Sequence, residues 1–235
     1  MPDLPVMAIT GASKGLGLEI ARHYLDNGFR VAGCSRGETS IKSDNYHHSQ
    51  LDVGDEKAVC QWIRFLKSEF KRIDVLICNA GYAPAALLQT MTSGKILESV
   101  LRTNIMGTFV AAREAAKVMM QQRSGRIITL SSMAVGLHQE GTSAYAASKS
   151  AIVEMTKILA KELAPFGVTC NVLAPSMVMT EAVQKLGDAV IQRALNDLTI
   201  KRVLTIAEIC NVISFLIAPE SRCITGQVIQ MGLVN

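Results

Sequence analysis

The chain has 235 residues, of which 49% are hydrophobic and 19% charged, so it can bury a sizeable core, and we expect one domain over residues 1-235. Its 24 basic and 20 acidic residues are dispersed and leave a formal net charge of only +4, which argues against a nucleic-acid-binding protein. No apolar run approaches the ~18 residues that cross a bilayer, and the amino terminus lacks the basic start of a signal peptide, so we expect a cytoplasmic protein without membrane attachment.

Strand patterns and helical patterns alternate along the whole chain. The strand patterns fall near 6-10, 30-35, 47-52, 73-79, 126-131, 167-173 and 227-231. The helical patterns fall between them, near 15-27, 55-70, 94-122, 145-164 and 207-217. This alternation predicts an α/β fold in which a doubly wound, mainly parallel, seven-stranded sheet has helices on both faces.

The first strand runs directly into a glycine-rich turn, Thr10-Gly-Ala-Ser-Lys-Gly-Leu-Gly17, and a helical pattern follows. Residues without Cβ let the backbone approach a pyrophosphate, and a helix amino terminus offers free N–H groups. The spacing G-x-x-x-G-x-G differs from the usual dinucleotide fingerprint, so by itself the turn could be an ordinary loop.

The second strand ends in Ser35-Arg36, nineteen residues past Gly17. A site specific for NAD usually holds a carboxylate about there, whereas an arginine accommodates a 2′-phosphate. Lys14, inside the glycine turn, adds a second cation on the same side. A single solvated basic residue is the commoner case, but two cations beside one phosphate position favour NADP.

Tyr145 and Lys149 stand four residues apart in a helical pattern, and Ser132 lies thirteen residues before Tyr145. A helix places such a pair on one face, where the ammonium can lower the pKa of the phenol and create a proton donor. A surface tyrosine packed under a lysine stem is the alternative. Ser132 is favoured over Ser131, which we expect to be structural, because Ser132 lies just past a strand's carboxyl end.

Several motifs in this order resemble those of the classical short-chain dehydrogenases/reductases: Thr10-Gly-x-x-x-Gly-x-Gly17, Asn79-Ala-Gly81, Asn104, Ser132, Tyr145-x-x-x-Lys149 and Thr225-Gly226. The resemblance implies a Rossmann-type fold and hydride transfer between NADPH and a carbonyl. It implies that Tyr145 protonates the substrate oxygen and Ser132 holds it. Lys149 would lower the pKa of Tyr145 and bind the ribose, and Asn104 would fix a water near Lys149.

The same resemblance implies a set of cofactor contacts. Asp52 would lie beside the adenine, although as bare sequence it could equally cap a helix. Asn79-Ala-Gly81 would lie beside the ribose, and Thr180 would bind the carboxamide. The full implied set is Gly11, Ser13, Lys14, Gly15, Leu16, Gly17, Ser35, Arg36, Asp52, Val53, Asn79, Ala80, Gly81, Tyr145, Lys149, Val178 and Thr180.

Across the whole chain the pattern is most similar to 3-oxoacyl-[acyl-carrier-protein] reductases. This implies a small-molecule carbonyl substrate, a 3-oxoacyl thioester carried on acyl carrier protein or CoA, and a homotetramer. The segment 176-204 would form a substrate lid. The alternatives are another lipophilic ketone, a polyketide, a steroid, a quinone or a secondary alcohol as substrate, and a non-catalytic NADP-binding sensor or assembly subunit.

Three positions depart from that group's pattern. Phe166 replaces an arginine that meets the acidic carrier protein, whereas Arg123 matches another such position. Ser176 replaces a glycine after the sixth strand, so we expect the lid to start along a different path. Met231-Gly-Leu233 replaces an Asp-Gly-Gly at a subunit interface. We infer changed specificity or assembly from these departures.

The cysteines and histidines indicate no metal site. The six cysteines form no C-x-x-C pair, and we expect free thiols, several of them buried, in a reducing compartment. His47 and His48 are adjacent on a predicted strand, so their side chains point to opposite faces, and no third ligand is evident.

Overall fold

The computed structural model describes residues 4–180, 183, 191–192 and 195–234. Seven strands form one sheet in the order β3-β2-β1-β4-β5-β6-β7, and every neighbouring pair is parallel. The strands are β1 (Val6–Thr10), β2 (Arg30–Ser35), β3 (Tyr46–Gln50), β4 (Val75–Cys78), β5 (Gly125–Leu130), β6 (Val168–Pro175) and β7 (Val228–Met231). The predicted doubly wound α/β sheet is confirmed, and it is parallel throughout.

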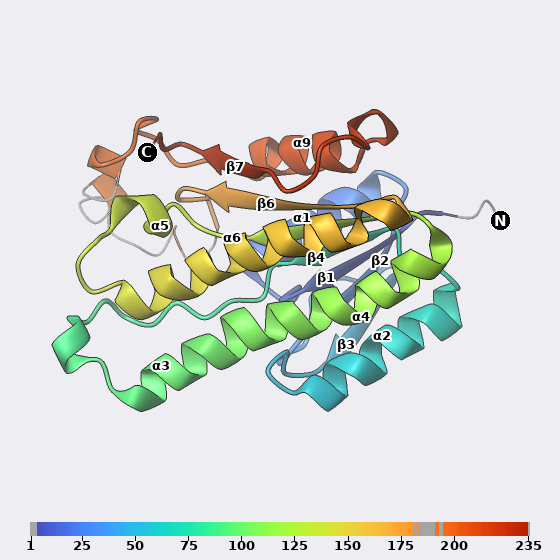
Figure 1. Cartoon of the computed structure of the whole chain (residues 1–235), viewed down its shortest axis with the longest axis horizontal. Coiled ribbons are helices and arrows are strands. Elements are labelled where there is room, and N and C mark those ends of the chain that lie inside the picture. Colours follow the sequence, from blue (N-terminus) through green and yellow to red (C-terminus); the bar gives the residue numbers. More distant parts are fainter. Residues whose placement is uncertain (1–3, 181–182, 184–190, 193–194, 235) are drawn as a thin grey trace.

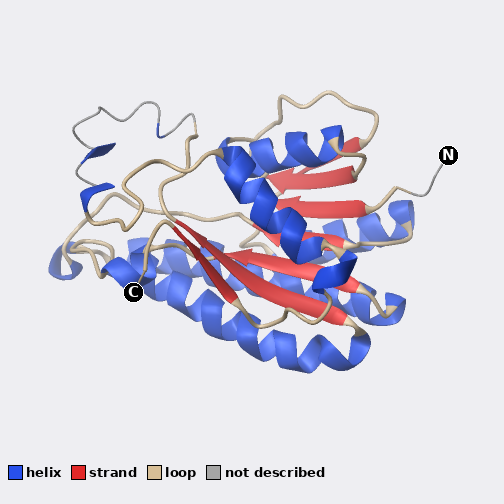
Figure 2. Cartoon of the chain, turned by 90° about the horizontal axis from the view of Figure 1, so that it is seen from above, coloured by secondary structure: helices blue, strands red, loops and turns tan. Residues whose placement is uncertain are grey.

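Helices cover both faces of this sheet (Figures 1 and 2). The α-helices are α1 (Gly15–Asp26), α2 (Glu56–Phe70), α3 (Gly94–Val100), α4 (Gly107–Gln122), α5 (Ala134–Leu137), α6 (Ser143–Leu163) and α9 (Ile206–Ile217). Short 3-10 turns occur at Gln89–Met91, Ala164–Phe166 and Pro219–Ser221. Within the described part of the chain, no helix is both long and apolar enough to cross a membrane.

Two apolar clusters hold the helices against the sheet. On one face, α2, α4 and α6 pack on the strands through side chains such as Trp62, Met119 and Leu163. On the other face, α1 and α9 pack through side chains such as Ile20 and Ile213. The central strands β1, β4 and β6 are buried along their whole length. β4 accordingly reads as an apolar run, whereas β1 ends in Thr10 and β6 also contains the buried polar residues Thr169 and Asn171.

The long helical pattern at 94-122 is interrupted by a different helix type. The segment Leu101–Met106 is a π-helix between α3 and α4, and Asn104 is its buried residue. π-helical segments inside α-helices are rare and occur often at functional sites. The π-helix therefore marks Asn104 as a candidate functional residue. The apolar periodicity alone did not predict this interruption of the helix.

The strand order places a crevice at the carboxyl edge of the sheet. The chain proceeds outward from β1 to β2 and β3, then returns to add β4 on the other side of β1. At such a reversal, the loops after β1 and β4 lead to opposite faces and leave room for a ligand between them. All strands point toward this edge in Figure 2.

Candidate active site

A groove of about 870 Å³ occupies this crevice. Its walls come from the turn after β1, the ends of β2 and β4, the loop after β3, and the π-helix. The lining residues are Gly11, Ser13, Lys14, Gly15, Ser35, Arg36, Gly37, Glu38, Leu51, Asp52, Val53, Asn79, Ala80, Gly81 and Thr103. Most of the residues predicted to bind the cofactor thus lie together, whereas Gly37, Glu38, Leu51 and Thr103 were not predicted.

The glycine turn can form this groove only because it lacks side chains. Gly11 has φ +74°, and a Cβ on it would lie 2.9 Å from the Cα of Ala80. A Cβ on Gly17 would lie 2.3 Å from the carbonyl oxygen of Gly11. The Asn79 amide fixes the turn by donating to the carbonyl oxygens of Thr10 and Gly11 at 3.0 and 3.1 Å. Because a Cβ at either position would collide with the backbone, the turn requires glycine there, and this distinguishes it from an ordinary loop.

The amino terminus of α1 opens onto the same groove. Lys14 is its N-cap residue and provides no side-chain cap, so the first-turn N–H groups stay available to an anion. Lys14 and Arg36 both line the groove and are exposed. Among the described residues neither has an ion-pair partner. The groove therefore combines free donors with two free cations, as a dinucleotide with an extra phosphate requires.

Asp52 lies at the other end of the groove, after β3. Its Oδ1 accepts a hydrogen bond from Gly54 N at 2.9 Å, and its Oδ2 lies 3.7 Å from an Arg102 guanidinium nitrogen. The N-cap of α2 is Asp55, whose carboxylate accepts from Ala58 N. Asp52 therefore caps a short turn and not the helix, and it remains beside the groove.

Tyr145 and Lys149 lie one turn apart on α6, with the Lys149 ammonium 5.7 Å from the centre of the Tyr145 ring. Lys149 is only 4% exposed, and its Nζ donates to the carbonyl oxygen of Leu130 at 2.7 Å. Burial lowers the pKa of Lys149 to about 8. Its ammonium is thus buried and hydrogen-bonded to the backbone, and it is not a surface charge over a ring.

Burial raises the pKa of Tyr145, and hydrogen bonding to Ser132 opposes that rise. Lys149 is not among the groups that shift it, so the lowering expected from Lys149 stays a prediction for the cofactor-bound site. In this structure Tyr145 is therefore a protonated phenol at neutral pH.

The two serines after β5 have different surroundings. Ser131 is buried, and its hydroxyl donates to the carbonyl oxygen of Lys149 at 3.1 Å. The half-buried Ser132 accepts from Ala134 N at 3.2 Å. A smaller hollow of about 210 Å³ adjoins Ser132, and its lining is Ser131, Ser132, Met133, Val135, Gly136, Val153, Lys157, Ala174, Val228, Gln230 and Leu233.

Asn104 connects the loop after β4 to α6. Its Oδ1 accepts from Tyr82 N at 2.7 Å, and its Nδ2 donates to Tyr82 O at 3.1 Å and to Ser148 Oγ at 2.9 Å. Ser148 Oγ in turn donates to Tyr145 O at 2.7 Å. A Cβ on Gly81 would lie 3.5 Å from Lys149 Nζ and 3.6 Å from Asn104 Oδ1. The cofactor groove, Asn104 and Lys149 therefore meet at Gly81.

The remaining predicted cofactor contacts lie at the margins. Leu16 and Gly17 belong to α1 behind the groove. Val178 is buried and bridges to Leu204, while Thr180 is half-buried and accepts from Val183 N at 3.4 Å. Part of the predicted lid at 176-204, namely residues 181–182, 184–190 and 193–194, lies outside the described residues.

Ser176 and Phe166, which depart from the pattern of the reductases that the sequence resembles, each have a neighbour that accounts for their packing. Ser176 is 7% exposed, and its backbone N–H donates to Met231 O at 2.9 Å. Gly232 has φ +92°, and a Cβ on it would lie 2.4 Å from Ser176 Oγ, so glycine provides the space that the serine fills. The Arg123 guanidinium lies 5.7 Å from the centre of the Phe166 ring.

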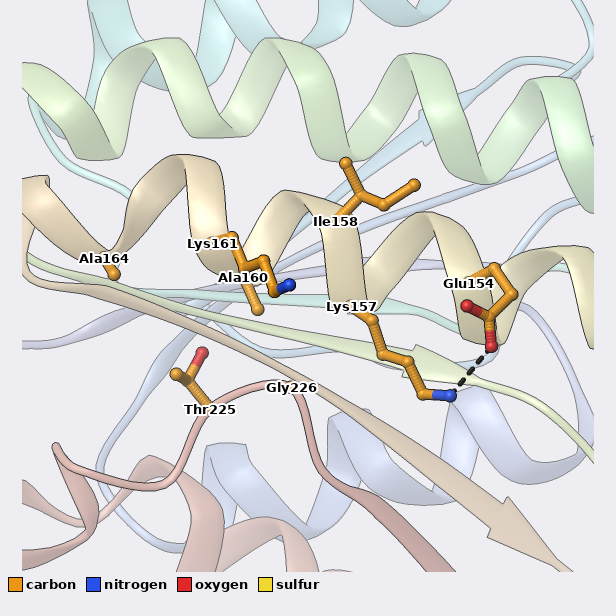
Figure 3. A pocket seen from close by; sticks show the side chains of 8 residues that line it. All are labelled: Glu154, Lys157, Ile158, Ala160, Lys161, Ala164, Thr225 and Gly226. Carbon is orange, nitrogen blue, oxygen red and sulfur yellow. Dashed lines mark hydrogen bonds and ion pairs between the residues drawn. The ribbon is translucent and has the colours of Figure 1, made fainter.

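A separate hollow of about 490 Å³ lies between the second half of α6 and the turn at Thr225–Gly226 (Figure 3). Its wall includes an ion pair in which Lys157 Nζ donates to Glu154 Oε1 at 2.7 Å. None of the predicted catalytic or cofactor-binding residues lines it. The candidate active site is therefore at the opposite end of α6.

The cysteines are free in the structure, and four of them, Cys34, Cys78, Cys170 and Cys210, are buried. No group of three potential metal ligands occurs within the described ranges of the chain. His47 packs on Phe65 with 4.5 Å between ring centres, whereas His48 hydrogen-bonds to Ser35 and Tyr46. The adjacent histidines therefore have separate surroundings.

Known proteins match this chain along most of its length. It is 32% identical over 234 residues to the 3-oxoacyl-[acyl-carrier-protein] reductase FabG of Staphylococcus aureus, which covers 95% of each chain. It is 34% identical over 221 residues to the 3-oxoacyl-[acyl-carrier-protein] reductase MabA of Mycobacterium bovis, covering 94% of this chain and 88% of that relative.

Solved structures share the fold closely. ElxO with NADP bound and a tyrosine-to-phenylalanine variant of ElxO with NADPH bound each give a TM-score of 0.91. Both are 29% identical to this chain and cover 97% of it and 96% of their own length. The family model described as short chain dehydrogenase matches residues 5–190. With this match and the relatives at 32% and 34% identity, the chain belongs to the short-chain dehydrogenase family.

Proposed function

We propose that this short-chain dehydrogenase uses NADPH to reduce a carbonyl group to a secondary alcohol, with a 3-oxoacyl thioester as substrate. The observation that carries the proposal is the meeting of the groove with the Tyr145 site at Gly81, next to Lys149 Nζ. A dinucleotide in the groove would bring its nicotinamide end to the same point as a buried ammonium and a phenol. That is the arrangement that hydride transfer coupled to proton transfer requires.

The charges in the groove support NADP as the cofactor. Lys14 and Arg36 line it together, and a 2′-phosphate adds about two negative charges that such cations can bind. Glu38 also lines the groove and would favour a ribose hydroxyl, but it is a single acid against two cations. The NADP and NADPH bound in the two ElxO structures are consistent with this choice.

The protein's own groups supply binding and the proton. Ser132 would donate a hydrogen bond to the substrate oxygen, and the protonated phenol of Tyr145 would deliver the proton as the oxygen gains charge. Lys149 would bind the ribose, and its charge would stabilise the phenolate that remains. The reduced nicotinamide supplies the hydride. Asn104 would hold a water at its Oδ1, beside Gly81, from which the proton is replaced.

Two observations support a 3-oxoacyl thioester. Both FabG and MabA, at 32% and 34% identity, are named 3-oxoacyl-[acyl-carrier-protein] reductases. In addition, the hollow next to Ser132 has apolar walls that include Met133, Val135 and Leu233, which suit an acyl chain. Carriage on acyl carrier protein or on CoA would deliver such a chain.

We also propose a homotetramer in a cytoplasmic setting. Leu97, Leu101 and Phe109 are exposed at four- and eight-residue spacing along α3, the π-helix and α4, and Ile158 is 57% exposed on α6. These helices run side by side on one face of the molecule (Figure 1). An apolar face of this kind on two long helices is typical of a subunit interface.

The test is an assay of NADPH and NADH oxidation, followed by the absorbance of the reduced nicotinamide. The substrates are 3-oxoacyl thioesters on CoA and on acyl carrier protein, with quinones and simple ketones as comparison. We expect turnover of the thioesters with NADPH. Turnover of only the other carbonyls would contradict the substrate, and tight NADPH binding without oxidation by any carbonyl would indicate a sensor.

A further inference from the structure

The edge strand β3 contacts the segment that carries Arg36, although β3 itself does not line the groove. Its residues alternate in direction, so His48 and Gln50 lie on one side and His47 on the other. The register pairs His48 with Gly33 and Gln50 with Ser35, which sets both side chains level with the end of β2.

Two side chains of β3 hold two consecutive carbonyl groups of this segment. Gln50 Nε2 donates to Arg36 O at 2.8 Å, and His48 Nε2 lies 2.9 Å from Gly37 O. Ser35 Oγ donates to the same Gly37 oxygen at 2.7 Å and lies 3.1 Å from His48 Nε2. The backbone on both sides of the Arg36–Gly37 peptide bond is therefore tied to the sheet.

These contacts show which ring nitrogen of His48 donates to the backbone. A carbonyl oxygen only accepts, so His48 Nε2 carries a hydrogen and donates to Gly37 O. In the neutral imidazole, His48 Nδ1 then accepts from the Tyr46 hydroxyl, 3.0 Å away. Tyr46 reaches this position across Gly33, where a Cβ would lie 2.2 Å from the Tyr46 oxygen. Gly33 therefore leaves the space that the Tyr46 side chain needs to reach His48.

We propose that His48 and Gln50 are positioning residues for cofactor selectivity, which hold the Ser35–Gly37 segment so that Arg36 meets the 2′-phosphate of NADP. This rests on the proposed role of Arg36 as a phosphate ligand. Arg36 and Gly37 are exposed, and such a segment without ties must be ordered when the ligand binds. The hydrogen bonds from β3 order it in advance and so raise the affinity for the phosphorylated cofactor.

The test compares NADPH and NADH binding, by fluorescence titration, in the full chain and in variants of β3. For His48→Leu and for Gln50→Ala we expect NADPH affinity to fall about tenfold, or about 1.4 kcal/mol, while NADH affinity changes less than about twofold. His48→Gln keeps an N–H donor near the Nε2 position and should restore most of the NADPH affinity. The matched control is His47→Leu, which should leave both affinities unchanged.

A merely structural role for these residues would weaken NADPH and NADH equally, and that result would overturn the proposal. So would unchanged NADPH affinity in both His48→Leu and Gln50→Ala. If His48→Leu does not fold, Gln50→Ala and His48→Gln decide the matter alone. Arg36→Ala distinguishes a failure of the phosphate site from a failure of the positioning role. If Arg36→Ala does not weaken NADPH binding, the proposed phosphate site is wrong. If only Arg36→Ala weakens it, the phosphate site stands and the positioning role of His48 and Gln50 is wrong.

Discussion

The ammonium of Lys149 donates to the carbonyl oxygen of Leu130 at 2.7 Å, so the last residue of β5 holds the cation that is proposed to stabilise the Tyr145 phenolate. The serines that follow Leu130 then reach Tyr145 and Lys149 from the same strand end. A single strand terminus thus sets the relative positions of a hydroxyl, a phenol and an ammonium.

Tyr145→Phe removes the proton donor while keeping the ring. We expect kcat to fall by at least about a hundredfold, the usual contribution of a positioned acid, while NADPH affinity stays nearly intact. The measurement is steady-state kinetics together with cofactor titration. Substantial residual turnover would show that another group supplies the proton.

Asn104→Leu removes three hydrogen bonds and leaves the Tyr82 backbone groups and the Ser148 hydroxyl without their partner. Because Asn104 is 0% exposed, we expect the free energy of unfolding to fall by about 2 kcal/mol or more, with a large loss of activity. Urea unfolding measures the first effect. Asn211→Leu, on the exposed side of α9, is the control and should change stability by less than about 0.5 kcal/mol.

Gly232→Ala tests the packing of Ser176 against the carboxyl-terminal strand. The added methyl group would strain a backbone with φ +92° and would collide with Ser176 Oγ. Gly28→Ala measures the backbone cost alone, because at φ +79° its Cβ would have nothing within 4 Å. We expect Gly232→Ala to destabilise more than Gly28→Ala by about 1 kcal/mol or more. Ser176→Gly in the Gly232→Ala background should recover that difference, and equal effects of the two alanine variants would disprove the collision.

The depressed pKa of Lys149 predicts a stability change at alkaline pH. The group titrates near 8 in the folded chain and near 10.5 in the unfolded chain, so the unfolded chain binds more protons between these values. The penalty for burying the charge is therefore fully present below pH 8 and is relieved as the pH rises toward 10.5.

We therefore expect the free energy of unfolding, relative to Lys149→Met, to rise by up to about 3 kcal/mol across this window. Urea unfolding of both proteins at several pH values measures it. Taking the difference between them removes the contributions of Cys34 and Cys170, buried thiols whose raised pKa values act in the opposite direction. A flat difference would mean that Lys149 is not desolvated.

The apolar face of α4 and α6 predicts the effect of added charge on assembly. Phe109→Glu and Ile158→Glu should each shift a homotetramer toward smaller species, because a buried carboxylate in the interface would lack a partner. Light scattering coupled to size-exclusion chromatography measures the mass. Phe65→Glu, which places the same charge on α2, should not change it, and an unaltered mass for all three variants would exclude this face as the interface.

The features of the fold that could be predicted from the sequence are those that a few residues adjacent in the chain determine. Buried parallel strands such as β4 and the first four residues of β1 read as apolar runs, and the glycines at Gly11 and Gly17 mark a turn that tolerates no side chain. Helical periodicity also placed Tyr145 and Lys149 on one face. Each of these signals depends on a few neighbouring residues.

The features that were not predicted depend on residues far apart in the chain. His48 and Gln50 meet the end of β2 only through the strand register, and nothing in the His47-His48 pair indicates it. Ser176 fits because Gly232 lies opposite. The direction of the Tyr145 pKa shift depends on how deeply the phenol is buried, which spacing from Lys149 does not give.

The π-helix at Leu101–Met106 also sets the rotational phase between the helices on either side of it. A residue added to or removed from an α-helix turns everything beyond it by about 100°. Deleting one residue from this segment would therefore swing the buried face of α4, with Val110 and Met119, away from the sheet. Apart from Asn104, the residues of this segment should thus tolerate substitution far better than any change in its length.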